Sequence, residues 1–357
     1  YGYSIVALAG LALGALLIGA AGCGGPAPGG ELPVAAYATA AAQLQATATA
    51  AAPPSIGSQA ATAAPSAGLP SAGATPVSSP APPGATAATA AATGVASPVA
   101  AASFDPVGLA AQMLDLINRD RAAAGLAAVA WDEAAAGVAA AHVADMAAHD
   151  YFSHWNPDGL GPDHRYSAAG GQHAAMENLY AYVSAFADGR GAPIADWPAV
   201  IDAAQASLMA SPGHRANILS PAHTHVGIGM AYDPDTGRLW LAQEFVNQYV
   251  TLAASLPDAA APGAAIRVAG AFGPAALGNA LLVLAYEPLP APLSAAELAA
   301  RSTYQSAAQS LDIRAIPLTF DETITLPAGP PGLYHLRLAV DTATGQAVVV
   351  DHVITVR

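Results

Sequence analysis

Hydrophobic and polar positions divide the 357-residue chain into four stretches. An apolar run over residues 4–21 comes first, and a long stretch with few large apolar side chains follows it. From Phe104 onward, apolar residues recur first at helical spacing and then in strand-like runs. Beyond Pro262, short apolar runs alternate with glycine and proline. The pattern therefore predicts a terminal segment, an unfolded linker and two folded domains.

Two helices are predicted at the start of the first folded domain. The first begins at Asp105 or Pro106 and stops at Gly125. Asp132 can cap the second, and Glu133 favours its positive end. One face of each helix is marked by residues three or four apart: Leu109, Met113, Leu116 and Ile117 in the first, and Val138, His142 and Met146 in the second.

A hairpin is predicted later in the same domain. Residues 226–230 form one strand, residues 234–237 form a turn, and residues 239–246 form the returning strand. Helices followed by a hairpin indicate a layered α+β domain, which we place at residues 105–252.

The last stretch, residues 262–357, predicts a small all-β sandwich. Its apolar runs lie at residues 266–272, 281–286, 313–318, 333–340 and 347–356. Residues 342–345 fit a hairpin turn. Ser294 and Glu297 have the spacing of a capping box, so an inserted helix or loop is expected within residues 291–310. This domain presents no titratable cluster and no metal-ligand spacing, and its function cannot be read from the sequence.

Composition identifies residues 24–104 as a tether. Residues 24–104 are almost entirely Ala, Pro, Ser, Thr and Gly, which bury too little surface to offset the entropy of ordering.

Residues 1–23 end at Cys23, the only cysteine, and resemble a lipoprotein signal with Cys23 as the lipidated residue. Another cleaved signal and an uncleaved anchor helix are the alternatives. All three predict an extracytoplasmic protein, either a cell-surface lipoprotein or a secreted one.

Charge excludes one class of partner. The formal net charge is −14, and the eleven basic residues, all arginine, form no cluster. Nucleic-acid binding requires basic patches, so no nucleic-acid partner is expected. A polybasic membrane anchor is excluded for the same reason, which leaves the N-terminal lipid anchor or signal as the membrane contact. We expect a monomer.

The candidate functional residues lie where polar side chains interrupt the predicted helices and strands. His154 directly follows the second helix and precedes a strong turn at residues 156–159. Glu177 follows a glycine-rich turn. His214 lies in a loop that runs into a short helix over residues 211–219, and His225 begins the hairpin.

Taken in order, these residues resemble the CAP superfamily (cysteine-rich secretory proteins, antigen 5 and pathogenesis-related proteins, with their SCP domain), and most closely its bacterial branch. The resemblance covers about residues 109–248. Its motifs are Asn118-Arg119-Asp120-Arg121, Gly125-Leu126, Trp131-Asp132, Ala141-His142, Asp145-Met146, Tyr151-Phe152-Ser153-His154, Asp158-Gly159, Glu177-Asn178, the block from Ser211 to Leu219, Val226-Gly227-Ile228-Gly229, and Trp240 with Gln243. It implies an α-β-α sandwich with a central antiparallel sheet and a large cleft.

The family's cleft carries two histidines and two acids. By position, His154 and His214 match the histidines and Glu177 matches the first acid. The second acid falls near Ser211, so the tetrad is incomplete. The resemblance implies no settled enzymatic activity, and whether the chain is an enzyme stays open at this point.

Two imidazoles and one carboxylate can bind a divalent metal with positions left open for water. Zinc is the natural cofactor for His154, Glu177 and His214, because calcium prefers more oxygens. Without a metal, Glu177 can orient a histidine that serves as general base. A buried polar network that only holds the domain together is the structural alternative.

Four further residues are predicted to support the site. Asn217 is expected to hold the loop that presents His214. Gln243, on the predicted hairpin, is expected to complete the polar surroundings of the site. Ser211 is a candidate nucleophile or hydrogen-bond partner. His225 either lines the rim of the cleft or caps the strand.

Three more polar residues are interpreted as structural. Arg121 is expected to reach helix or loop carbonyls. His142 is expected to be a packing histidine, and His164 is expected to lie in a loop.

Three functions fit these predictions. The first is a cleft that binds a divalent metal, a small apolar molecule or a surface ligand. The second is a metal- or histidine-dependent hydrolase that uses the same cleft. The third is a structural or adhesive surface protein that acts through the β domain.

Overall fold

The computed structural model describes residues 103–186, 190–301 and 303–357. The predicted signal with Cys23 and almost all of the predicted tether, residues 24–104, lie outside this range. The described residues belong to one compact unit, which contains a layered domain and a β-sandwich. Within them, no helix is both long and apolar enough to cross a membrane.

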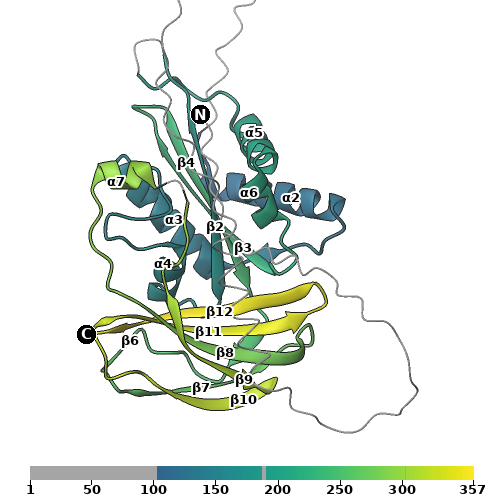
Figure 1. Cartoon of the computed structure of the whole chain (residues 1–357). Helices are drawn as coiled ribbons and strands as arrows, with labels where there is room; N and C mark the ends of the chain where they lie inside the picture. Colours follow the sequence, from purple (N-terminus) through teal and green to yellow (C-terminus); the bar gives the residue numbers. More distant parts are fainter. Residues whose placement is uncertain (1–102, 187–189, 302) are drawn as a thin grey trace, which may run out of the picture. The chain divides into compact units, whose positions relative to one another are not determined.

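A four-stranded sheet forms the centre of the layered domain (Figure 1). Its strands, in spatial order, are β1 (Ala130–Trp131), β3 (His225–Asp233), β4 (Arg238–Asn247) and β2 (Ala174–Val183). Strands β3, β4 and β2 are antiparallel, and only the short β1 runs parallel to its neighbour. The β3–β4 hairpin is the predicted one. Strand β2 was not predicted, because its polar residues Glu177 and Asn178 interrupt the apolar alternation.

Helices cover both faces of this sheet, as expected for an α-β-α sandwich (Figure 1). On one face lie α3 (Glu133–Ala148) and α4 (Pro162–Ala168), and on the other lie α2 (Pro106–Ala123), α5 (Trp197–Ala210) and α6 (Pro212–Ile218). The predicted caps are confirmed, since Asp105 accepts from the amide of Val107 and Asp132 from that of Ala135.

The glycines of β3 let α3 lie directly on the sheet. A Cβ added to Gly227 would lie 1.9 Å from the backbone nitrogen of Ala136, and one added to Gly229 would lie 2.3 Å from the carbonyl carbon of Ala139. Only glycine allows so close an approach of helix and strand backbones. The glycines that alternate with apolar residues in β3 therefore set the short distance between α3 and the sheet.

Arg121 has the structural role that the sequence predicted. Its side chain is almost completely buried and donates to four backbone carbonyls, those of Ala127, Ile218, Ser220 and His223, at 2.8–3.2 Å. It thereby joins the end of α2 to the loop that follows α6.

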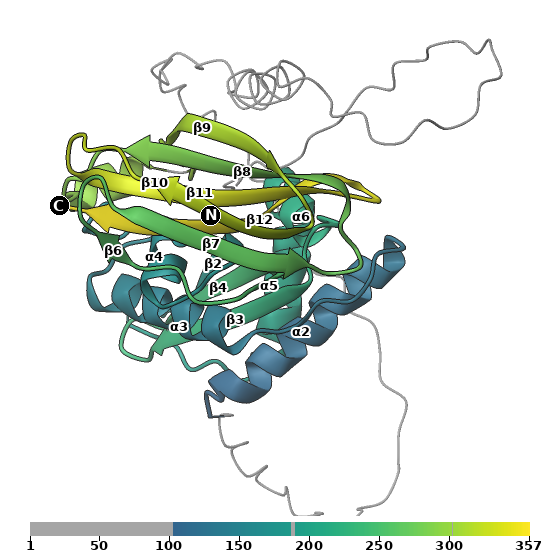
Figure 2. The same ribbon diagram turned by 90° about the horizontal axis from the view of Figure 1, so that it is seen from below.

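The C-terminal region from β5 onward is a β-sandwich, which confirms the predicted fold class (Figure 2). One sheet has the order β6-β12-β11-β8-β9 and the other the order β10-β7-β5, with an apolar core between them. The strands are β5 (Val250–Leu252), β6 (Ala259–Ala260), β7 (Ala265–Phe272), β8 (Leu277–Glu287), β9 (Gln309–Ile316), β10 (Thr319–Thr325), β11 (Gly332–Thr342) and β12 (Gly345–Val356). The predicted capping box begins α7 (Ala295–Ala300), where Ser294 accepts from the amide of Glu297.

Three strands of the sandwich differ from the prediction, and one of them is the two-residue β6, which lies before residue 262 and which no predicted run covers. Residues 250–252, which we assigned to the end of the layered domain, form β5 and pair with β7, so the sandwich begins before residue 262. Strand β10 lies just beyond a predicted run, and most of its side chains are exposed and polar. A three-residue strand and a largely exposed strand both carry too little apolar periodicity to be recognised.

The layered domain contacts the sandwich through α4. Ser167 Oγ lies 3.0 Å from Nδ1 of His352 and accepts from the amide of Val353 at 2.7 Å. His164, which we expected in a loop, lies in α4 and is buried against Glu287 of β8. The expectation that the sandwich carries no titratable cluster is also wrong, because its strands supply several buried charged groups at this contact.

Candidate functional site

His154 and Glu177 form the centre of the candidate site. Nδ1 of His154 lies 2.6 Å from Oε1 of Glu177, and both residues have no exposed surface. His154 comes from the loop that follows α3, and Glu177 comes from β2. An ionised carboxylate can only accept, so Nδ1 is the donor, and in the neutral tautomer the lone pair lies on Nε2.

Arg165 of α4 donates hydrogen bonds to both members of this pair. Its Nη2 donates to Oε2 of Glu177 at 2.8 Å, and its Nη1 donates to the backbone carbonyl of His154 at 2.6 Å. Burial alone would raise the pKa of Glu177, but Arg165 and the two nearby histidines, His142 and His154, hold it well below its usual range. Glu177 is therefore an ionised carboxylate whose two oxygens are both engaged.

His142 packs against the same carboxylate. Its Nε2 donates to the backbone carbonyl of Ser153 at 2.9 Å and lies 3.9 Å from Oε2 of Glu177. Burial, together with the charge of Arg165, lowers the pKa of His142 to about 4. It is thus a neutral packing histidine, as expected, although it also borders the site.

His214 lies on α6 and is 3% exposed. Burial and the neighbouring charge of His154 lower its pKa to about 4. Asn178, next to Glu177 in β2, donates to the backbone carbonyl of His214 at 3.3 Å. The side chains of Asn217 and Gln243 both bond to Asn178 at 3.0 Å, so three amides hold the segment that carries His214.

The other two predicted residues lie at element ends. Ser211 occupies the N-cap position of α6, three residues before His214. His225 begins β3, and its Nδ1 lies 2.9 Å from Oγ1 of Thr224. Across the sheet His225 is paired with Val246, two positions along β4 from the partner of Glu177.

The trio of His154, Glu177 and His214 does not offer three free ligand atoms in this arrangement. Both oxygens of Glu177 are already bonded, to His154 and to Arg165. Among the described residues, the one group of three with ligand atoms within 4.8 Å of one another lies elsewhere and is described below. Zinc at the trio stays a prediction.

Comparison with known proteins gives the family of this domain. The model of the CAP family, described as the cysteine-rich secretory protein family, matches residues 114–249. Residues 114–249 form a CAP domain. Among curated proteins, the chain is 31% identical over 144 residues to the uncharacterized membrane protein YlbC and 26% identical over 157 residues to the uncharacterized protein YkwD, both of Bacillus subtilis. These matches cover 39% and 44% of this chain, but only 34% and 52% of the relatives.

Solved structures with similar regions are also bacterial. An extracellular protein containing a SCP domain from Bacillus anthracis is 30% identical, with a TM-score of 0.32 over 40% of this chain and 41% of that one. An outer surface protein of Borrelia burgdorferi is 15% identical, with the same TM-score over 40% of this chain and 94% of its own.

Glu244 is a residue of the CAP domain's site that sequence reasoning missed. It pairs directly across the sheet with Glu177 and has no exposed surface. Neither of its carboxyl oxygens has a hydrogen-bond partner among the described residues. Burial and the charge of Glu177 raise its pKa well above the usual value, so it is a neutral acid next to an ionised one.

A signal for Glu244 was present in the sequence. The predicted strand over residues 239–246 is apolar except for Gln243 and Glu244, and a lone acid in such a strand indicates a buried polar role. The family resemblance places the second acid near Ser211, whereas strand pairing brings a second acid, Glu244, from β4.

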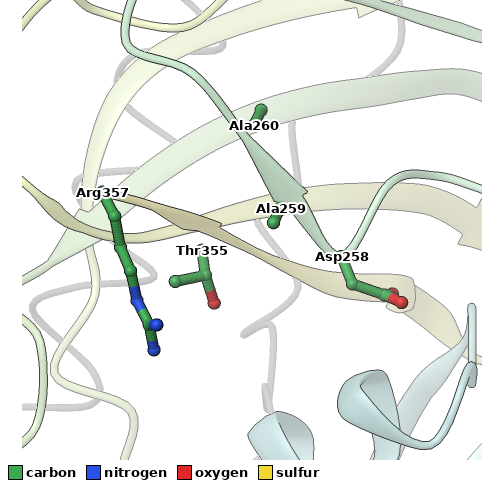
Figure 3. Close-up of a pocket in the computed structure, with 5 residues that line it drawn as sticks. All are labelled: Asp258, Ala259, Ala260, Thr355 and Arg357. Atoms are coloured by element: carbon green, nitrogen blue, oxygen red, sulfur yellow. The ribbon is translucent and has the colours of Figure 1, made fainter.

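A separate surface pocket of about 490 Å³ lies in the sandwich (Figure 3). It is lined by Asp258, Ala259, Ala260, Thr355 and Arg357, at the pairing of β6 with β12. None of these residues belongs to the His154 site.

Proposed function

We propose that this protein is an extracytoplasmic CAP-domain hydrolase in which His154 is the general base. The observation that carries the proposal is the fixed orientation of one imidazole. Glu177 holds Nδ1 of His154, and Nε2 is buried without a hydrogen-bond partner among the described residues. A base held by a third group in this way is the usual arrangement for abstracting a proton.

The chemistry follows from that orientation. A water molecule bonded to Nε2 of His154 gives its proton to the ring while its oxygen attacks an electrophilic carbon or phosphorus of the substrate. The bond from that atom to the leaving group then breaks, and the imidazolium returns the proton to the leaving group. The resulting imidazolium is stabilised by the ionised Glu177, and Arg165 keeps that carboxylate ionised. The neutral Glu244 adds no second negative charge to this environment.

Access to Nε2 requires movement, because His154, Glu177 and His214 are each at most 3% exposed. The loop that carries His154 is the segment that would have to shift. We therefore expect a small substrate group to reach the site rather than a folded macromolecule.

The test is a panel of peptide, nucleotide and lipid-ester substrates offered to the full chain. His154→Gln keeps the size of the side chain but removes the base, and we expect a loss of about 10²- to 10⁴-fold in kcat/KM. Glu177→Gln should also lower the rate, and His149→Gln, at an exposed histidine at the end of α3, should not. Activity that survives both His154→Gln and Glu177→Gln would contradict the proposal.

A second candidate is a divalent ion such as zinc bound by His154 and His214. Neutral imidazoles are the form that binds metals, and the lowered pKa of His214 keeps it neutral. Glu177 would then accept from Nδ1 of His154 and orient the ring, rather than bind the ion. Metal analysis of the full chain against the His154→Ala, His214→Ala double variant tests this, and unchanged metal content would exclude the assignment.

A further inference from the structure

A second group of buried polar residues lies where α4 of the CAP domain meets the sandwich. Asp163 and His164 come from α4, Glu287 from β8 and His335 from β11. Each of the four is at most 5% exposed. None of them is a member of the proposed catalytic pair, His154 and Glu177, although the charge of Asp163 acts on Glu244.

Ligand-type atoms converge in this group. Asp163, His164 and His335 each offer one atom, and these atoms lie within 4.8 Å of one another. Nε2 of His164 is hydrogen-bonded to Oε1 of Glu287, and Nε2 of His335 lies 3.4 Å from the same oxygen. Three ligand-type side chains, drawn from both domains, thus converge on one small region, and Glu287 contacts both of the imidazoles.

Two of these atoms are buried without a hydrogen bond. Oδ2 of Asp163 and Nε2 of His335 have no hydrogen-bond partner among the described residues, and the side chain of Asp163 is only 6% exposed. The other nitrogen of His335, Nδ1, lies 2.8 Å from Asp351. A carboxylate behind one imidazole nitrogen fixes the ring and leaves the other nitrogen as the ligand atom.

The charges in the group do not balance with fixed cations alone. Asp351 is paired with Arg337 at 2.9 Å, so that carboxylate is compensated. Asp163 and Glu287 have no arginine within ion-pair distance among the described residues; their ion-pair partners are His164 and His335. Since uncompensated buried charge is costly, a divalent cation would neutralise the two carboxylates directly.

We propose that Asp163, His164, Glu287 and His335 bind one divalent metal ion of the zinc class, which links the CAP domain to the sandwich. Two imidazoles and two carboxylates suit a four-coordinate zinc ion. Calcium would require more oxygen ligands than this group provides.

Binding has an identifiable local cost. Nδ1 of His164 now accepts from the amide of Gly161 at 2.9 Å, so the ring proton lies on Nε2, toward Glu287. The metal replaces that proton on Nε2. The ring then carries its proton on Nδ1, 3.6 Å from Oδ1 of Asp163, and Gly161 loses its acceptor. The metal therefore competes with one proton and one hydrogen bond.

The experiment uses the full chain, stripped with a chelator and then titrated with zinc. We expect saturable binding of one ion per chain and a higher melting temperature with zinc. Asp163→Asn with His335→Gln removes two ligands and should weaken binding by more than about 100-fold. The matched control is His352→Gln, because His352 is a buried histidine at the same domain contact, bonded to Ser167, but outside the group.

The outcomes separate this site from the catalytic one. Retention of zinc by the His154→Gln, His214→Gln variant, with loss in the Asp163→Asn, His335→Gln variant, supports the proposal. It is overturned if the unaltered chain binds no zinc, if the Asp163 variant keeps it, or if only the His154 variant loses it. Should the Asp163→Asn, His335→Gln variant fail to fold, cobalt substitution of the His154→Gln, His214→Gln variant replaces it: a tetrahedral spectrum supports the site, and an octahedral one overturns it.

Discussion

Glu177 on the edge strand β2 and Glu244 on β4 are direct cross-strand partners, and of the two only Glu177 has hydrogen-bond partners among the described residues. Two adjacent buried carboxylates cannot both be ionised at low cost. Arg165 and the histidines stabilise the charge on Glu177, so Glu244 carries the proton. Strand register thus sets which of the two acids is charged.

Glu244→Gln should stabilise the protein at pH 7. The folded-state pKa of Glu244 is raised, so the stability it contributes is complete below its unfolded pKa and is lost as pH rises toward the folded value. A glutamine has a similar shape and does not ionise in the unfolded state. We expect a gain on the order of 1 kcal/mol in the free energy of unfolding at pH 7, and little change near pH 4.

Urea unfolding at both pH values checks this prediction. Glu322→Gln is the control, since Glu322 lies on the partly exposed strand β10. Equal effects of Glu244→Gln at pH 4 and pH 7 would show that Glu244 is ionised in the folded protein.

The contribution of Glu177 to protein stability should depend on pH in the opposite direction. Its folded-state pKa is lowered, so its contribution is present above the unfolded pKa and is lost as pH falls toward the folded value. Arg165→Met leaves the buried Glu177 without its cation and should cost about 3–5 kcal/mol at pH 7. The cost should shrink below about pH 4, where the carboxylate becomes protonated in the unfolded chain.

Urea unfolding of the parent chain and of Arg165→Met from pH 3 to pH 7 tests the predicted direction of this pH dependence. Arg267→Met is a matched control, because Arg267 and its partner Asp321 are both more than half exposed. An exposed pair contributes at most about 1 kcal/mol. A constant cost of Arg165→Met over the whole range would contradict the assigned ionisation of Glu177.

The sequence predicted what local patterns determine. The caps at Asp105 and Asp132 and the β3–β4 hairpin follow from a few neighbouring residues, and each is present. His154 and Glu177 lie far apart along the chain but were placed in one site by the order of the family motifs, and the structure joins them at 2.6 Å.

Pairings between distant elements could not be predicted in this way. Glu244 becomes a neighbour of Glu177 only through the register of β2 with β4. His164 and His335 meet only because α4 contacts the sandwich, and neither domain alone contains a recognisable spacing. A helix of seven residues such as α4 also has too few apolar positions to show its period, which is why His164 was assigned to a loop.

Asn178 should act as the central member of an amide network. It bonds to the side chains of Asn217 and Gln243 and to the backbone carbonyl of His214. Asn178→Ala leaves these buried groups unpaired and should cost about 2–3 kcal/mol. A double-mutant cycle with Asn217→Ala checks the connection, and we expect a coupling energy of about 0.5–3 kcal/mol. Additive effects would mean that the two side chains act independently.

The segment that contains α7 should control access to His154. Leu298 of α7 is 3% exposed and packs with Met146, Tyr151 and Trp240 of the CAP domain. The same segment contacts both neighbours of His154: Ser153 donates to the carbonyl of Arg301 at 3.4 Å, and the Arg301 guanidinium lies 4.9 Å from the ring of Trp155. Movement of the loop that carries His154 therefore requires these contacts to break.

Leu298→Ala should loosen this contact without unfolding the sandwich. The truncation of a buried leucine costs about 2–5 kcal/mol where the site stays formed, so local opening of the α7 segment becomes cheaper than global unfolding. Hydrogen exchange should accelerate in residues 290–301 and 151–159, and not in β11 and β12. Leu311→Ala, at a leucine that is 52% exposed on β9, is the control and should leave exchange unchanged. If exchange at residues 151–159 stays at the parent rate in Leu298→Ala, the α7 segment does not restrain the loop that carries His154.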